Sequence, residues 1–306
     1  MRAAIVACVL SVVSASAYAQ GGRANQAPGP SVTVNGQTWS QQALFQRNIG
    51  GPDDMTTAYP PHKVIGNIYY VGTKSLAVYL IVTPAGNILI NSTYERNVPL
   101  IQKSVEQLGF KFSDTKILLG SHAHGDHQEG DAMVKQMTGA QVIAMAEDVP
   151  ALEAMKPGGK AHPIDRVIHD GDTVTLGGTT LTAHLTPGHT RGCTTWTLRA
   201  TDGGKPYEVV IIGSLGTNPG FRLVNNPDIP NQADEYERAF KTTKALKCDV
   251  PLGSHPSMYN LDKKFPLIGK GPNPFIDPAG CKAEVELAEA MFRAVLAEQK
   301  KAAGIQ

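Results

Sequence analysis

Four side chains that can bind metal stand within six consecutive residues, directly after a short apolar run, and this motif limits what the chain can become more than any other feature. The motif consists of His122, Ala123, His124, Gly125, Asp126 and His127. Proteins hold zinc through imidazole, thiolate and carboxylate groups, and a catalytic zinc keeps one position open for water. In an extended segment the rings of His122 and His124 point to the same side, because they are two residues apart. Past Gly125 the chain can turn, so that Asp126 and His127 face a second ion.

Two later histidines each follow a run of residues that is typical of a strand. His189 comes after residues 179–185, and His255 comes after residues 249–252. With these two residues the chain offers two sets of three donors, and each set leaves its metal ion open to water. The first set is His122, His124 and His189, and the second set is Asp126, His127 and His255.

The motif and the two lone histidines resemble the metallo-β-lactamase superfamily, and the pattern is most similar to subclass B3. The resemblance runs from about residue 64 to the final helix and includes residues 187–190 and 214–223. It implies an α/β fold, an αββα sandwich of two mixed β-sheets with helices on the outer faces and two zinc ions between the sheets. It also implies that the two sets of donors are the zinc ligands, and that Asp126 additionally orients or accepts a proton from the nucleophile.

One position separates relatives within this superfamily. Hydroxyacylglutathione hydrolases and acyl-homoserine lactonases carry a metal-bridging Asp at the end of the strand that corresponds to residues 208–212, and subclasses B1 and B2 carry a zinc-binding Cys near the same point. This chain reads Gly213-Ser214 there. A serine at this position, with His127 as a ligand, is similar to the B3 pattern.

Three residues are candidates for binding the substrate: Ser214, Thr217 and Tyr259. Ser214 stands at a strand end, where its hydroxyl either bonds to a metal-bound water or the substrate carboxylate, or forms an ordinary turn. Gly216 occupies the place of a second serine in several relatives, so that Thr217 or Asn218 would have to replace it. Tyr259 either walls the pocket or packs in the core.

The resemblance implies hydrolysis of the β-lactam amide bond by a hydroxide that bridges the two zinc ions, which would confer resistance to β-lactam antibiotics. The alternatives are another small-ester, lactone or thioester hydrolase of the same fold, and a non-catalytic zinc-binding protein. A structural zinc site would close its ligand shell, whereas both sets here are open. Residues 113–116 match S-x-x-K of serine β-lactamases, but they lead into a strand and the partner motifs S-D-N and K-T-G do not occur, which favours a turn.

The first 19 residues have the pattern of a secretory signal peptide, with an apolar core at residues 3–13 and an A-x-A sequence before a cleavage point after Ala19. A membrane span needs roughly 20 apolar residues, so we expect no membrane anchor and a periplasmic enzyme. Three cysteines then remain in an oxidising compartment. We expect Cys248 and Cys281 to pair, which would restrain the segment with His255, and Cys193 to be a buried strand residue.

The composition is that of a folded enzyme that acts on a small molecule. With 306 residues, 42% hydrophobic and 18% charged, the chain can bury one sizeable core. Its net charge is +1 and it has no long basic run, so neither nucleic acid nor an anionic membrane is the expected partner. We expect a monomer that binds a β-lactam.

The pattern along the chain predicts two parts after the signal peptide. Residues 20–61 are polar and rich in Gly, Pro and Gln, and we expect a mobile arm that can lie over the site. We expect residues 62–306 to form the metallo-β-lactamase domain that the resemblance implies, with a strand at residues 172–185 and a flexible loop, a candidate lid, at residues 156–160. Helices are expected at residues 98–108, 130–137, 232–246 and 283–300.

Overall fold

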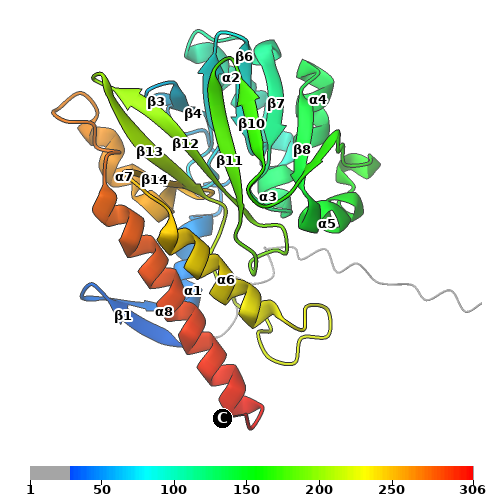
Figure 1. The fold of residues 1–306 in the computed structure, drawn as a ribbon, viewed down its shortest axis with the longest axis vertical. Helices are drawn as coiled ribbons and strands as arrows, with labels where there is room; N and C mark the ends of the chain where they lie inside the picture. Colours follow the sequence, from blue (N-terminus) through cyan, green and yellow to red (C-terminus); the bar gives the residue numbers. More distant parts are fainter. Residues whose placement is uncertain (1–27, 306) are drawn as a thin grey trace, which may run out of the picture.

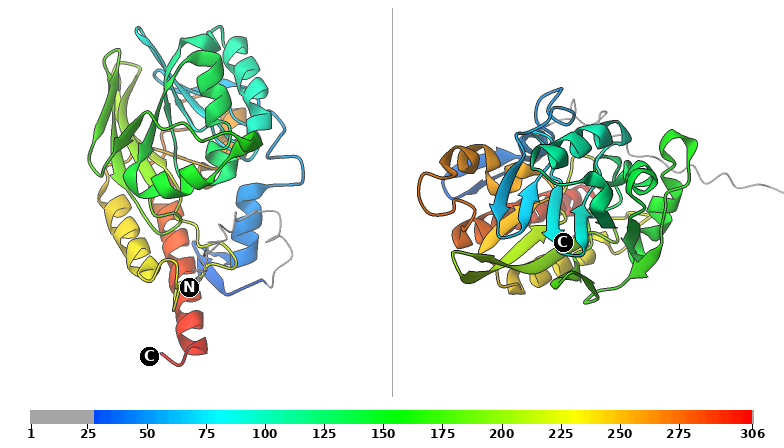
Figure 2. Two further views of the ribbon diagram at one scale, coloured as in Figure 1. Left: turned by 90° about the vertical axis from the view of Figure 1, so that its right-hand side faces the viewer. Right: turned by 90° about the horizontal axis from the view of Figure 1, so that it is seen from above.

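Two β-sheets lie face to face in the middle of the molecule, and helices cover their outer sides (Figures 1 and 2). The computed structural model describes residues 28–305, so the signal peptide expected at residues 1–19 lies outside the described part. Both sheets are mixed, because each combines antiparallel and parallel strand pairs. The predicted αββα sandwich is therefore confirmed.

The first sheet has seven strands in sequence order. They are β3 (His62–Ile65), β4 (Ile68–Tyr70), β5 (Tyr79–Thr83), β6 (Gly86–Ile90), β7 (Thr115–Leu119), β8 (Gln141–Met145) and β9 (Arg166–Ile168). The second sheet has five strands, β10 (Thr173–Leu176), β11 (Thr179–Leu185), β12 (Thr194–Asp202), β13 (Lys205–Ile212) and β14 (Val250–Gly253).

The helices are placed by the connections between strands. They are α1 (Gln41–Ile49), α2 (Val98–Gln107), α3 (Gly125–Gln128), α4 (Asp131–Thr138), α5 (Val149–Ala154), α6 (Gln232–Ala245), α7 (Leu261–Lys264) and α8 (Pro278–Ala302). Parallel neighbours in a sheet need a crossover connection, and α2 and α4 lie in the connections from β6 to β7 and from β7 to β8. The helices α6 and α8 cover the second sheet.

The central strands are apolar on both faces because both faces are covered. In β5, Ile81 packs into the core between the two sheets, whereas its neighbour Leu80 packs under α2. Trp196 of β12 is fully buried between the sheets, and its Nε1 donates a hydrogen bond to the carbonyl of Gly120 at 2.9 Å. This bond joins the second sheet to the point where β7 ends.

The side chains expected in the site follow strand ends. The motif follows β7, His189 follows β11, Ser214 follows β13 and His255 follows β14. Rigid strands therefore deliver each loop, and a loop carried by a rigid framework is the usual place for binding residues.

The expectation of a mobile arm was wrong for residues 31–49. These residues form a hairpin of β1 (Ser31–Val34) and β2 (Gln37–Ser40), followed by α1. Ser40 caps α1 by accepting a hydrogen bond from the amide of Ala43, and Phe45 and Ile49, four residues apart, form a buried stripe. Arg47 makes a bidentate ion pair with Glu284 of α8, which fixes α1 to α8.

Two other boundaries differ from the sequence pattern. The strand expected at residues 172–185 is a hairpin of β10 and β11, because Gly177 and Gly178 both adopt positive φ and form a tight turn. The last helix begins at Pro278, five residues earlier than expected, with the Asp277 side chain accepting a hydrogen bond from the amide of Gly280. Within residues 28–305 we find no helix with the length and apolar character needed to span a bilayer.

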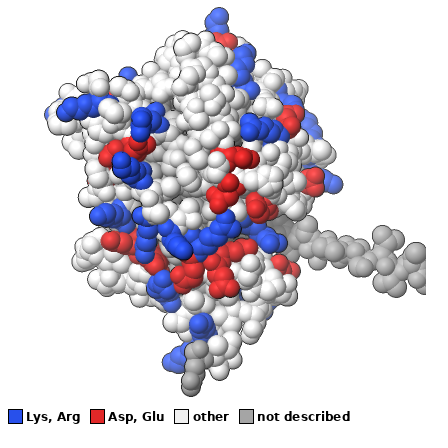
Figure 3. Space-filling model, viewed as in Figure 1, with Lys and Arg blue, Asp and Glu red and all other residues white. Residues whose placement is uncertain are grey.

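Basic and acidic side chains lie next to one another in a band over α6 and α8 on the face drawn in Figure 3. Arg293 pairs with Glu237 and Glu289, and Lys244 also contacts Glu289. Exposed pairs of this kind contribute little individually, but here they join two helices that already share an apolar contact.

A disulfide joins Cys248, between α6 and β14, to Cys281 in the first turn of α8, with 6.2 Å between the two Cα atoms. The expected pairing is confirmed. Cys193 is buried, as expected, and its thiol donates a hydrogen bond to the carbonyl of Ser214. The disulfide restrains the chain on both sides of the loop that carries His255.

We expect the paired substitutions Cys248→Ser and Cys281→Ser to lower the free energy of unfolding by about 3 kcal/mol, because opening a covalent loop gives conformational entropy to the unfolded chain. Urea denaturation without reductant measures the difference. The unchanged protein in reducing buffer is the control and should match the variant. Equal stability of the variant and the oxidised protein would contradict this expectation.

Candidate metal centre

The motif leaves β7 in an extended conformation and then turns into a short helix. His124 has φ −113° and ψ 150°, and α3 begins at the following Gly125. Asp126 and His127 therefore lie in the first turn of α3, while His122 and His124 stay on the extended segment. The amides of Ser92 and Thr93, each at 2.9 Å, donate to the carbonyl of His127 and hold this turn against the end of β6.

The structure brings the six expected donors together in two groups. Within each group, the candidate ligand atoms all lie within 4.8 Å of one another. The first group is His122, His124 and His189, and the second group is Asp126, His127 and His255. The rings of His122 and His127 are 4.2 Å apart between centroids, so that the two groups are adjacent. Metal binding by these residues stays a prediction, but their convergence is an observation.

Burial and the pattern of hydrogen bonds fit both groups to cations. His122 and His127 are almost fully buried, yet Nε2 of His122 and Nδ1 of His127 have no hydrogen-bond partner among residues 28–305. A buried polar atom without a partner is costly, and a bound cation removes that cost. Imidazole nitrogen and carboxylate oxygen are donors that zinc accepts. The residues present therefore fit zinc.

Two imidazoles have their tautomers set by main-chain carbonyls. Nδ1 of His189 lies 2.7 Å from the carbonyl of Gly216, and Nδ1 of His255 lies 2.9 Å from the carbonyl of Ser75. A carbonyl only accepts, so each Nδ1 must carry the proton and each Nε2 is left as a lone-pair donor. This arrangement orients a metal-binding imidazole in many metalloproteins.

The electrostatics favour the protonation states that metal binding requires. Burial, together with the neighbouring imidazoles, lowers the pKa of His122 and of His189 well below the usual value. Burial and His127 likewise lower the pKa of His255 to about 4. Burial alone would raise the pKa of Asp126, but the adjacent His127, 3.2 Å away, and the other imidazoles hold it well below the ordinary range. These shifts favour an ionised Asp126 and neutral rings at His122, His189 and His255.

The three expected substrate residues lie in different surroundings. Ser214 is buried just after β13, and its hydroxyl accepts a weak hydrogen bond from the amide of Gly216 at 3.3 Å. Thr217 lies beside it, with its carbonyl bonded to the side chain of Gln41 in α1. Tyr259 is 2% exposed within the core between the sheets, so packing explains it and we no longer retain it as a substrate residue.

The structure also shows what surrounds Gly216 and His189, including Tyr236 and Phe221, which the sequence pattern did not single out. A Cβ placed on Gly216 would lie 3.4 Å from Oδ1 of Asn218, an ordinary van der Waals contact, so the side chain of Asn218 borders the position of the missing serine. The hydroxyl of Tyr236 in α6 donates to the carbonyl of Gly216 at 2.7 Å, beside the bond from His189. Phe221 lies against the ring of His189, with 5.5 Å between centroids. Only the periodicity of α6 pointed to Tyr236, and that pattern does not distinguish a core residue from a positioning one.

Comparisons with known proteins agree with this geometry. The family model described as the metallo-beta-lactamase superfamily matches residues 72–203. The FEZ-1 metallo-β-lactamase from Legionella gormanii is 50% identical, covers 80% of this chain and 98% of its own, and has a TM-score of 0.77. BJP-1, a subclass B3 metallo-β-lactamase of Bradyrhizobium japonicum, is 40% identical over 82% of this chain and 98% of its own, with a TM-score of 0.76.

Curated relatives match over a shorter stretch. A hydroxyacylglutathione hydrolase from Hyphomonas neptunium is 44% identical over 72 residues, which are 24% of this chain and 25% of the relative. One from Rhodospirillum rubrum is 35% identical over 89 residues, 29% of this chain and 30% of the relative. The chain therefore matches less than a third of the length of these two relatives.

Acid should destabilise the metal-free protein. The pKa of His255 falls from 6.5 to about 4 on folding, so between these values the unfolded chain binds a proton that the folded chain does not. The stability that the neutral ring contributes is complete above pH 6.5 and is lost as the pH falls toward 4. The buried His122 and His189 shift in the same direction.

We expect the urea midpoint of chelator-treated protein to fall between about pH 7 and about pH 5. A His255→Gln variant is the matched control, because its side chain does not titrate, and its midpoint should fall less steeply. A midpoint that does not change over this range, or that changes equally in both proteins, would contradict the expectation.

Proposed function

The chain belongs to the metallo-β-lactamase superfamily, and from this premise we propose that it is a zinc-dependent hydrolase of the subclass B3 type that opens the ring of β-lactam antibiotics. The observation that carries the proposal is the second donor group, Asp126, His127 and His255, with no carboxylate at the end of β13. Relatives whose names identify them as β-lactamases match over nearly their whole length, which supports the same substrate class.

The second candidate is a thioester hydrolase, because the curated relatives named above carry that type of activity in their names. The family resemblance implies that hydroxyacylglutathione hydrolases carry a metal-bridging aspartate at the position that follows β13. A side chain on Gly213 would meet the carbonyl of Thr194 at 2.4 Å, and the next residue is the neutral Ser214. Neither position supplies a carboxylate, and this favours the β-lactamase.

The residues of the chain have separable roles in this reaction. Bound zinc would lower the pKa of a water molecule toward neutrality and polarise the substrate carbonyl. Asp126, buried and ionised, can orient the attacking water and accept its proton. His189 and His255 keep their rings oriented through main-chain carbonyls, so that their Nε2 atoms stay available as donors.

We also propose where the substrate carboxylate binds. Ser214 and Thr217 offer hydroxyl groups, and Asn218 offers an amide beside Gly216. The hydroxyl of Thr217 has no hydrogen-bond partner among the described residues, which leaves its proton available. These neutral donors can orient a carboxylate, and they would replace the second serine that this chain lacks.

We further infer that the enzyme acts as a monomer in an oxidising compartment, the periplasm of a Gram-negative host. The closed disulfide between Cys248 and Cys281 supports the compartment, because such bonds do not persist in a reducing cytosol. One chain supplies all six donors, which supports the monomer.

The first experiment is an assay of the purified protein with a chromogenic cephalosporin. We expect turnover that disappears on treatment with a chelator and returns when zinc is added, because both donor groups are built for cations. Undiminished turnover after complete metal removal would contradict the metal mechanism. Cleavage of S-lactoylglutathione without cleavage of any β-lactam would favour the second candidate.

A second experiment separates ligand histidines from other buried ones. His189→Ala should lose about one zinc equivalent per chain and at least about 10³-fold in kcat/KM, since it removes a donor of the first group. His184→Ala is the control, because His184 lies on β11 and its ring bonds to the hydroxyl of Thr197, which belongs to neither donor group. We expect the control to keep both zinc equivalents. Equal zinc contents of the two variants would contradict the assignment.

A further inference from the structure

Asp148 is a buried carboxylate beside the first donor group, and neither the metal-binding motif nor the proposed reaction accounts for it. It stands after β8, at the start of α5, and is 3% exposed. No basic side chain forms an ion pair with it among the described residues. A carboxylate removed from water in this way needs hydrogen-bond donors.

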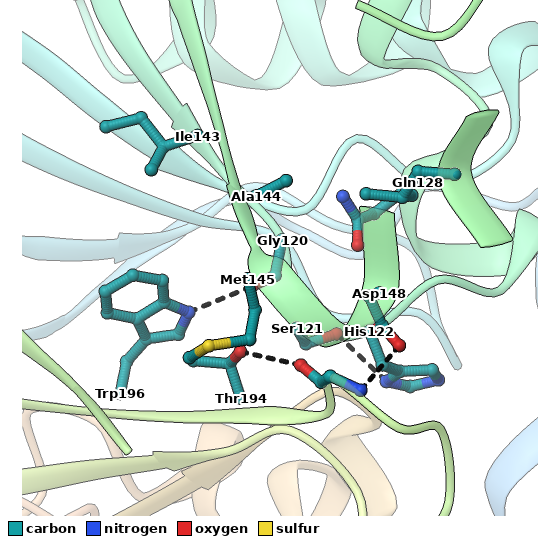
Figure 4. A pocket seen from close by; sticks show the side chains of 12 residues that line it. Gly120, Ser121, His122, Gln128, Ile143, Ala144, Met145, Asp148, Thr194 and Trp196 are labelled. Carbon is teal, nitrogen blue, oxygen red and sulfur yellow. Dashed lines mark hydrogen bonds between the residues drawn. The ribbon is translucent and has the colours of Figure 1, made fainter. Parts of the chain in front are cut away.

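Three donors from two different loops converge on this carboxylate. Oδ2 of Asp148 accepts hydrogen bonds from the amide of Ala123 at 2.8 Å and from the hydroxyl of Thr190 at 2.9 Å. Oδ1 accepts the amide of Gly192 at 2.7 Å. Figure 4 shows Asp148 next to Ser121 and His122 in the small cavity behind the first donor group.

The positions of these donors relate Asp148 to all three histidines of the first group. Ala123 lies between His122 and His124 in the chain, and Thr190 directly follows His189. One side chain therefore joins the loop after β7 in the first sheet to the loop after β11 in the second sheet. The distance between these loops decides whether three imidazoles can reach one ion.

The contact is closely packed. A Cβ added to Gly192 would lie 2.4 Å from the amide nitrogen of Asp148 and 2.6 Å from its Cβ. Only a glycine lets the second loop approach this near, so the loop after β11 rests directly on the backbone and side chain of Asp148. The second group has different supports, Ser75 for His255 and Ser92 with Thr93 for His127.

We propose that Asp148 is a positioning residue that holds the loops of His122, His124 and His189 at the spacing needed to bind one zinc ion, and that it acts selectively on this first group. The inference rests on the proposed metal centre but not on the identity of the substrate. Loss of a side chain that orients metal ligands typically weakens metal binding roughly 10- to 100-fold.

The test measures zinc affinity in two backgrounds, each with one group disabled. His255→Ala leaves the first group intact, and His189→Ala leaves the second group intact. Asp148→Asn is then added to each, because an amide has the same shape but its NH₂ cannot accept, so that at least one of the three donors loses its partner. Competition with a chromogenic zinc chelator gives the dissociation constant of the remaining ion.

We expect Asp148→Asn to raise the zinc dissociation constant roughly 10- to 100-fold in the His255→Ala background and less than about 3-fold in the His189→Ala background. Asp249→Asn is the matched control. The Asp249 carboxylate also accepts a hydrogen bond from a main-chain amide, that of Glu208 on β13, but it contacts neither donor group. The control should change neither constant.

A milder variant keeps the test decisive if Asp148→Asn does not fold. Thr190→Val retains the carboxylate and removes a single donor, so we expect a loss of roughly 3- to 10-fold, again only in the His255→Ala background. Equal losses in both backgrounds indicate a general structural role and overturn the inference, as do unchanged constants. If the unsubstituted protein binds no zinc, both the proposed metal centre and the positioning role of Asp148 are overturned.

Discussion

The free-energy cost of burying polar groups determines what the cluster of donors requires. Five imidazoles and a carboxylate lie together, most of them removed from water, and two of the rings have nitrogen atoms with no protein partner. Such an arrangement is unfavourable unless cations occupy it, because unpaired polar atoms lose their hydration and receive nothing in return. Burial keeps the ring of His122 neutral, and the neighbouring imidazoles keep Asp126 ionised. The rest of the fold can be understood as the support that makes this arrangement persist.

That support comes from strand ends and from main-chain carbonyls. Two stiff sheets deliver four loops to one place, and the bond from Trp196 to Gly120 joins the sheets at the base of the motif. Each later histidine is then oriented by a carbonyl, and Tyr236 holds the carbonyl that orients His189. The geometry of the site is therefore built from backbone positions, which explains why glycines without room for a side chain recur near it.

The N-terminal segment belongs to the same framework. Instead of lying loosely over the site, α1 packs against α8 through the ion pair of Arg47 with Glu284. The side chain of Gln41 bonds to the carbonyl of Thr217, in the segment where we place the substrate carboxylate. The helix α1 therefore contacts both α8, through Arg47, and the segment proposed to bind the substrate carboxylate, through Gln41.

The sequence alone pointed to the six side chains that converge and, through the family resemblance, to the αββα fold, because metal ligands must be of particular residue types at short spacings and apolar periodicity follows the geometry of strands and helices. It also pointed to the pairing of Cys248 with Cys281. The hairpin within residues 172–185, the early start of α8 and the packing of α1 were missed, since turns, caps and a polar helix give weak local signals.

Only the tertiary structure decided which residues support the donors. Asp148 and Tyr236 lie far from the motif in sequence, and neither an aspartate nor a tyrosine has a pattern that reveals its contacts. Tyr259 stands next to the His255 loop in sequence, yet it packs in the core. Ligand identity is a chemical property that can be read along the chain, whereas the position of a ligand depends on contacts between distant segments, and these exist only once the two sheets have closed on each other.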